Sequence, residues 1–244
     1  LNGYSDASIL LLNAGSRLDT LDMRGFSCLH YACYSGNNSI VKHIINKYMM
    51  ESSFNIKSIL ECRAEGGYTP LLCACHREYN RVDKEGNRIN KLQQISHASV
   101  VDTLMQHGAD LTACDQEGNT SLHIATIERQ FEVAETVVKS AEIVLRKNFL
   151  SFINTKNTEG DTALHIACVQ GQLRLAVMLI QAGADVFIIG TTSNEMKLEP
   201  IRLCPNNHMY QLTYAAMLHK SIYNWLGQCL HQLDPIFIAS TSSV

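Results

Sequence analysis

One eight-residue pattern recurs four times along the chain, and no other feature limits the fold as strongly. Residues 118–125 read GNTSLHIA and residues 160–167 read GDTALHIA, with weaker copies at 25–32 (GFSCLHYA) and 67–74 (GYTPLLCA). A period of this size is typical of repeat proteins, in which each repeat is a small unit that stacks on its neighbours. The sequence therefore predicts a stack of similar units.

Each copy predicts a tight turn followed by two helices, and the fourth copy shows this most plainly. Asp161 and Thr162 offer side-chain oxygens that can accept hydrogen bonds from the free amides at a helix start. Apolar residues recur at helical spacing between residues 164 and 180, and Gly171 marks a break between two helices. Gly183 can adopt the left-handed conformation that ends a helix. Because two short helices cannot bury their apolar faces alone, neighbouring pairs are expected to share a core.

The pattern Gly-x-Thr-x-Leu-His-x-Ala, followed by a helix that ends in Gly-Ala-Asp, resembles the ankyrin repeat. The Gly-Ala-Asp ending stands at 108–110 and 183–185, and the resemblance covers about residues 1–185. Residues 212–216 (LTYAA) look like a degenerate fifth copy that closes the stack. The resemblance implies an all-α ankyrin-repeat solenoid of about five helix-turn-helix units, with long insertions between helices and between repeats.

The repeats are longer than the ankyrin period of about 33 residues. The leucines that mark the copies are 42, 51, 42 and 48 residues apart, at Leu29, Leu71, Leu122, Leu164 and Leu212. We expect one domain, 1–244, with a partial repeat at 1–16, repeats at 17–60, 61–112, 113–152 and 153–186, and an insertion with a degenerate capping repeat at 187–244.

The extra residues are expected in loops, because stacked helices leave no internal room for them. The most polar insertion, 78–97, fits either a solvated loop or an element that recognises a partner. The insertions at 49–60 and 141–152 contain apolar residues, which are expected to lengthen the outer helix or to pack beneath the next turn. A further insertion occupies 186–207.

Charge and composition argue against several classes of protein. A net charge of -3, from 20 basic and 23 acidic residues, offers no broad attraction to nucleic acid or to an anionic membrane. No apolar run approaches the roughly 18 residues that span a bilayer. Nine cysteines with irregular spacing favour a reducing compartment, cytoplasmic or nuclear, over a secreted disulfide framework. We therefore expect a protein partner, no direct contact with nucleic acid, no membrane insertion and a monomeric domain.

Histidine and cysteine recur at repeat positions, which favours a structural role over metal binding. His30, His123 and His165 occupy one place in three copies, where the two ring nitrogens can bridge backbone groups of adjacent repeats. Cys73 and Cys75 lie two residues apart on a predicted helix, so their side chains point about 200° from each other. We expect buried cysteines, no metal and no cofactor.

A pair that could carry chemistry lies outside the repeats, at Cys204 and His208. A cysteine hydrolase needs a thiolate beside a histidine and an orienting group. A surface loop with one incidental cysteine is the alternative. The sequence contains no nucleophile motif and no phosphate-binding loop, so we expect no catalytic residue and no enzyme.

The ankyrin resemblance implies a concave binding surface formed by the turn tips and the exposed end of each first helix. Aromatic and arginine side chains dominate binding hot spots, so the predicted anchors are Phe26, Tyr34, Tyr68 and Arg77. At the turn tips the predicted partner-binding residues are Met23, Arg24, Phe26, Glu65, Tyr68, Gln116, Glu117, Asn119, Thr158, Glu159 and Asp161. At the helix ends they are Tyr34, Ser35, His76, Arg77, Ile127, Glu128, Val169 and Gln170.

The function implied by this resemblance is binding of a protein partner, as an adaptor or inhibitor. Within ankyrin proteins, long extensions after the outer helix of alternating repeats resemble the inhibitor-of-NF-κB group, which implies regulation of a transcription factor. The insertion within residues 67–113 is also similar to that of a Notch-type ankyrin domain. The alternative is a targeting module of a larger enzyme, channel or pathogen effector. Residues 1–12 lack signal-peptide features and read as part of a helix, so we expect a segment of a larger protein.

Overall fold

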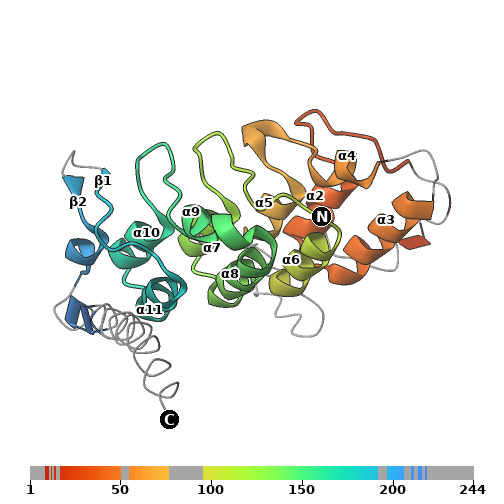
Figure 1. Cartoon of the computed structure of the whole chain (residues 1–244). Helices are drawn as coiled ribbons and strands as arrows, with labels where there is room; N and C mark the ends of the chain where they lie inside the picture. Colours follow the sequence, from red (N-terminus) through yellow and green to blue (C-terminus); the bar gives the residue numbers. More distant parts are fainter. Residues whose placement is uncertain are drawn as a thin grey trace, which may run out of the picture.

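The computed structural model describes residues 17–50, 55–76, 96–191 and 197–205, together with the single residues 9, 10, 12, 14, 210, 211, 214, 215 and 218. Within these residues, helix pairs stand side by side in an elongated row (Figure 1). The first helices of the pairs are α2 (Cys28–Tyr34), α5 (Pro70–Ala74), α7 (Ser121–Ile127) and α10 (Ala163–Val169). The second helices are α3 (Asn38–Met50), α6 (His97–Gln106), α8 (Phe131–Leu145) and α11 (Leu173–Ala182). The predicted helical repeat fold is confirmed.

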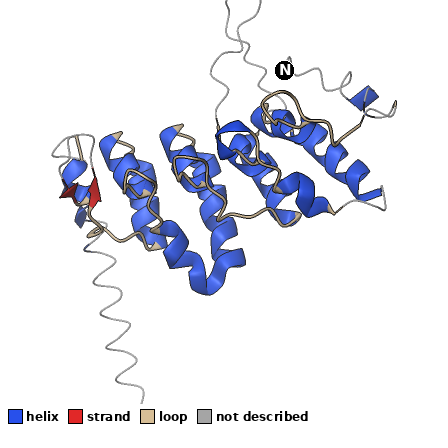
Figure 2. Ribbon diagram, turned by 90° about the horizontal axis from the view of Figure 1, so that it is seen from above, coloured by secondary structure: helices blue, strands red, loops and turns tan. Residues whose placement is uncertain are grey.

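Shorter elements occupy the connections between these pairs. They are α4 (Ile56–Leu60), η1 (Glu65–Gly67), η2 (Arg146–Asn148), α9 (Phe149–Ile153) and η3 (Pro200–Leu203). In the 186–207 insertion, β1 (Gly190–Thr191) pairs antiparallel with β2 (Lys197–Leu198), an addition to the helical fold that the sequence did not predict. Figure 2 shows this small strand pair at one end of the row. Residues 78–95 of the predicted insertion 78–97 lie outside the described residues. Residues 96 and 97 are described and form the start of α6.

Two insertions contribute to the core, as predicted. In the first, α4 buries Ile59 and Leu60. In the third, α8 continues to Leu145, and α9 then buries Phe152 and Ile153. Both insertions therefore add buried apolar side chains to the core. The division of the whole chain into the ranges given above stays a prediction.

Each first helix begins at a hydroxyl side chain, which explains the Thr or Ser of the repeated pattern. Thr120 and Thr162 form capping boxes with His123 and His165, and each histidine Nδ1 lies 2.8 Å from its threonine Oγ1. The ring nitrogen accepts from the threonine backbone amide, at 3.2 Å in α7 and 3.1 Å in α10. Free backbone groups at a buried helix start need such partners. The repeated histidine is therefore part of the helix cap.

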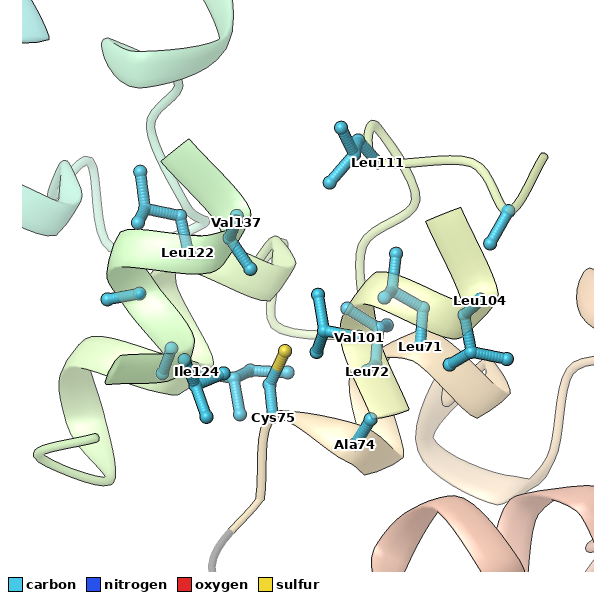
Figure 3. Close-up of a cluster of buried hydrophobic side chains, with 14 of the residues drawn as sticks. Leu71, Leu72, Ala74, Cys75, Val101, Leu104, Leu111, Leu122, Ile124 and Val137 are labelled. Atoms are coloured by element: carbon cyan, nitrogen blue, oxygen red, sulfur yellow. The ribbon is translucent and has the colours of Figure 1, made fainter. Parts of the chain in front are cut away.

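One hydrophobic core runs through the described repeats. It takes side chains from first and second helices of successive pairs, and Leu71, Leu104 and Leu122 are all at most 1% exposed. Figure 3 shows α5, α6, α7 and α8 contributing neighbouring side chains to one cluster. Because α6 packs against α8 and α5 against α7, each pair covers apolar surface of the next. Among the described helices, none is both long and apolar enough to cross a membrane.

The turns between the pairs project on one side of the row and are tied together by backbone hydrogen bonds (Figure 1). The Glu65 amide donates to the Arg24 carbonyl at 2.8 Å, and the Gln116 amide donates to Gly66 at 2.8 Å. The Thr158 amide donates to the Glu117 carbonyl at 2.9 Å. The turn tips therefore form a connected surface.

This close approach of turns gives a prediction for two glycines with positive φ. Gly118 has φ +74, and a Cβ atom there would lie 3.0 Å from the Thr158 amide nitrogen. Gly108 has φ +86, but a Cβ atom there meets nothing within 4 Å. We expect Gly108→Ala to lower the free energy of unfolding by about 1 kcal/mol, through backbone strain alone, and Gly118→Ala by about 2–3 kcal/mol. Urea unfolding of both variants measures the difference, and equal losses would contradict the proposed contact between turns.

Candidate functional site

A hollow on the side of the turn tips and first helices joins the first two described helix pairs. It has a volume of about 430 Å³ and is lined by Arg24, Phe26, Tyr31, Tyr34, Tyr68, Cys73 and His76. We call this depression the aromatic hollow. Phe26, Tyr31, Tyr34 and Tyr68 are all half-buried, so each ring is held by the protein and still presents surface to solvent.

Neighbouring elements position the rings of the aromatic hollow. Phe26 follows the turn at Gly25, and its ring centroid lies 5.6 Å from that of Tyr31 on α2. Tyr68 precedes α5 and His76 follows it, with ring centroids 5.1 Å apart in an edge-to-face arrangement. The Tyr34 ring lies 6.4 Å from His76 and closes the wall between the two repeats. Such contacts fix aromatic rings in place.

Hydrogen bonds and ion pairs hold the polar groups at the edge of the aromatic hollow. The Tyr31 hydroxyl donates to Asp22 Oδ2 at 2.5 Å, and this bond lowers the pKa of Asp22 and raises the pKa of Tyr31. Arg24 Nε lies 2.6 Å from Glu65 Oε2. The edge is thus preorganised by side chains of both repeats.

Carboxylates of the third repeat also act on the aromatic hollow. His76 Nδ1 lies 3.2 Å from Glu128 Oε1, which links the end of the second repeat to the third. Burial raises the pKa of the Tyr68 hydroxyl, and the carboxylates of Asp115, Glu117 and Glu128 raise it further. The electrostatic environment of Tyr68 is therefore negative.

The structure brings several predicted partner-binding residues together. Arg24, Phe26, Tyr34, Tyr68 and His76 line the aromatic hollow, while Glu65 and Glu128 are bonded to two of these residues. Tyr31 was not among the predicted residues. The signal for it is an aromatic residue directly before the repeated alanine, which among the four clear copies occurs only in the first.

The other predicted residues differ in how accessible they are. Met23, Val169 and Ile127 are exposed at 106%, 53% and 40%. Asn119 is buried, and its amide donates to Asp115 and Glu117, so its side chain stabilises the turn and is not exposed to a partner. Of the remaining predicted residues, Gln116, Glu117, Thr158 and Glu159 are exposed, and Ser35, Asp161 and Gln170 are half-buried. The predicted anchor Arg77 lies outside the described residues.

Family models agree with the geometry of stacked helix pairs. A model described as "Ankyrin repeats (3 copies)" matches residues 91–190, and one described as "Ankyrin repeat" matches residues 24–58. Together these matches cover more than half of the chain. The chain belongs to the ankyrin-repeat family. The ankyrin resemblance predicted from the repeated pattern is confirmed.

Within the ankyrin family, the chain is similar in sequence to proteins named as inhibitors of NF-κB. "NF-kappa-B inhibitor zeta" from Mus musculus is 29% identical over 227 residues, covering 87% of this chain and 29% of that protein. The Homo sapiens protein of the same name is 28% identical over 227 residues, covering 87% of this chain and 30% of that protein. The chain thus spans less than a third of the length of these relatives. The likeness to the inhibitor-of-NF-κB group is confirmed at the level of sequence similarity.

A solved ankyrin structure supports the same fold. The ankyrin repeat domain of Bcl-3, described as a unique member of the IkappaB protein family, matches with a TM-score of 0.60 and 20% sequence identity. The match covers 86% of this chain and 76% of that chain. At this level of identity the comparison supports the ankyrin fold alone.

His30 and His123 bridge neighbouring ankyrin repeats, as predicted from their period. His30 Nε2 lies 3.0 Å from the Cys62 carbonyl and 3.1 Å from the Tyr68 carbonyl, both in the next repeat. His123 Nε2 lies 3.1 Å from the Asp161 carbonyl. Because the ring must donate to a carbonyl while Nδ1 accepts, the neutral form fits this position. Burial lowers the pKa of His30, and it lowers the pKa of His123 to about 4.

This depressed pKa predicts that acid destabilises the ankyrin stack. The unfolded chain binds a proton at His123 near the ordinary pKa of 6.5, whereas the folded chain binds it only near 4. The stabilising contribution is therefore complete above pH 6.5 and is lost as the pH falls from 6.5 toward 4. We expect His123 to account for a loss of about 2 kcal/mol between pH 7 and pH 5. Urea unfolding at both pH values measures this loss, and a His123→Gln variant should show a smaller pH dependence.

The repeat cysteines of this ankyrin domain are core residues. Cys33, Cys73, Cys75 and Cys168 are buried, and burial raises the pKa of the Cys73 thiol to about 12. The prediction of buried cysteines is confirmed. In the described part of the chain, no group of three or more His, Cys, Asp or Glu side chains could hold a metal ion. Cys204 is half-buried against the core, whereas His208 lies outside the described residues.

Proposed function

We propose that this ankyrin domain binds a protein partner through the aromatic hollow, the turn tips and the exposed ends of the first helices. The observation that carries the proposal is the hollow itself, in which four half-buried aromatic rings from two repeats face a cavity of about 430 Å³. Clustered aromatic side chains in a concave site are typical of binding hot spots. The domain then acts as an adaptor or inhibitor of the partner it holds.

The proposed partner is a transcription factor of the NF-κB type. The support is the 29% identity to "NF-kappa-B inhibitor zeta" over 87% of this chain. A net charge of -3 is consistent with binding protein and not nucleic acid directly. On this proposal the domain works in the cytoplasm or the nucleus, as a monomer and without catalysis of its own.

Binding to purified NF-κB dimers tests this function and gives a prediction for salt. Because the hollow is mainly aromatic and the charges around it are mixed in sign, we expect the affinity to fall by no more than about tenfold between 50 and 500 mM salt. Isothermal titration calorimetry of residues 1–244 against each dimer measures the affinity. No binding to any NF-κB dimer would contradict the proposed partner, and a fall of several orders of magnitude with salt would contradict the proposed kind of interface.

A further inference from the structure

We propose that the aromatic hollow holds an arginine side chain of the protein partner, stacked on the tyrosine and phenylalanine rings and close to carboxylates at the edge. This inference rests on the proposed function, because the arginine belongs to a bound protein. Beyond the proposed function, the inference specifies which chemical group of the partner enters the hollow. The argument depends on the walls, the charges and a cation already present at the edge.

The walls of the aromatic hollow suit a flat, weakly hydrated cation. Four half-buried rings surround it, from Phe26, Tyr31, Tyr34 and Tyr68. Aromatic faces attract cations, and guanidinium stacks on them with less loss of hydration than an ammonium group. An ammonium group is a compact, strongly hydrated charge, so it loses more when it leaves water for an aromatic face. The walls therefore favour arginine over lysine.

The chain itself shows a guanidinium in this chemical setting. The Arg24 guanidinium carbon lies 5.3 Å from the Phe26 ring centroid, while Arg24 Nε lies 2.6 Å from Glu65 Oε2. One planar cation is thus held at the edge of the hollow by an aromatic ring and a carboxylate together. Because Glu65 pairs with Arg24, the positive charge of Arg24 is balanced and does not exclude a second cation.

The charge near the aromatic hollow is complementary to a cation. Of the described residues that line it, only Arg24 carries a permanent positive charge. Carboxylates bond to lining residues at Asp22, Glu65 and Glu128. The raised pKa of Tyr68, caused by burial and by Asp115, Glu117 and Glu128, is a second sign of this negative environment. A purely apolar side chain would fill the hollow but would use none of these charges.

The size of the aromatic hollow admits a long side chain together with part of its backbone. Its volume of about 430 Å³ lies within the usual range of ligand sites, about 300–1,000 Å³. Because the hollow opens between two repeats, the segment that carries the arginine would lie across the turn tips.

Short peptides test the arginine assignment without knowledge of the partner. The probes are acetyl-GSGXGSG-amide peptides in which X is arginine, citrulline or norleucine. Citrulline keeps the shape of arginine but is neutral, and norleucine keeps only an apolar chain. Titration of residues 1–244, followed by the NMR signals of the tyrosine rings, gives the affinity of each peptide. We expect the arginine peptide to shift the Tyr31, Tyr34 and Tyr68 signals and to bind at least fivefold more tightly than either control peptide.

Variants locate the binding and keep it distinct from a change in folding. Tyr34→Leu retains an apolar side chain but removes the aromatic face. We expect this substitution to lower the affinity for the arginine peptide at least fivefold. Ile143→Ala changes an exposed side chain on the second helix α8, outside the hollow, and should leave the affinity unchanged. The absence of shifts with the arginine peptide, or equal affinities for the three peptides, would overturn the proposal.

The two proposals fail in different ways. If the arginine peptide binds in the hollow but no NF-κB dimer binds the domain, the proposed partner is wrong and the arginine site stands. In the opposite case, an NF-κB dimer binds the domain and Tyr34→Leu lowers its affinity, but the citrulline and norleucine peptides bind as tightly as the arginine peptide. The proposed function then stands and the arginine assignment is overturned.

Discussion

Replacing Leu122 by alanine should lower the free energy of unfolding by about 3–4 kcal/mol. Leu122 lies on α7, is 1% exposed, and belongs to the cluster shared by α5, α6, α7 and α8 (Figure 3). The substitution removes apolar contacts and leaves a cavity that tightly packed neighbours fill only in part. Urea unfolding monitored by circular dichroism measures the loss.

The control for Leu122 lies on the same helix. Ile127 is 40% exposed at the end of α7, and we expect Ile127→Ala to lower the free energy of unfolding by less than about 1 kcal/mol. Because the repeats share their core, the Leu122→Ala variant should unfold at lower urea throughout the described stack. A loss below about 1 kcal/mol for Leu122→Ala would show that the repeats do not depend on a shared core.

Changing Phe26, Tyr34 and Tyr68 together to alanine should weaken partner binding by at least about 100-fold. One true anchor contributes on the order of 2 kcal/mol, and three rings of one hollow act together, so their effects need not add. The reason is that the triple substitution removes most of the aromatic surface that lines the hollow. Calorimetry with the NF-κB dimer that binds the unchanged domain measures the loss.

A control and a folding test belong with the triple variant. All three rings also pack partly against the core, so the unfolding transition of the variant must be measured, and the corresponding leucine variant retains more of this packing. Ile143→Ala changes a 73% exposed residue on α8, outside the hollow, and should leave the affinity unchanged. A folded triple variant with unchanged affinity would rule out the aromatic hollow as the binding site.

The repeated sequence pattern predicts the elements that depend on local chemistry. The hydroxyl before each first helix predicts its cap, as Thr162 shows. The period of His123 predicts a structural role, because a residue that recurs at one place in three copies meets the same kind of neighbour each time. Apolar residues at helical spacing predict both helices of a pair, as in α10 and α11. These features can be predicted from the sequence because each depends only on one repeat and its nearest neighbour.

Features formed by a single pair of repeats were harder to predict. The aromatic hollow depends on how Tyr31 and Tyr34 of one repeat face Tyr68 and His76 of the next, and the sequence gives no distances between them. Tyr31 has no equivalent in the three other clear copies, so periodicity did not single it out. The β1–β2 pair has two residues in each strand, too short for an alternating pattern to show.

Hydrogen exchange of residues 1–244, with and without a bound NF-κB dimer, tests most directly whether the stack binds a protein on the side of its turn tips. The account predicts slower exchange at the turn tips around residues 22–26, 65–68 and 116–119 and in α2 and α5, with little change in the second helices α3, α6 and α8. Slower exchange confined to those second helices, with no change at the turn tips, would contradict it.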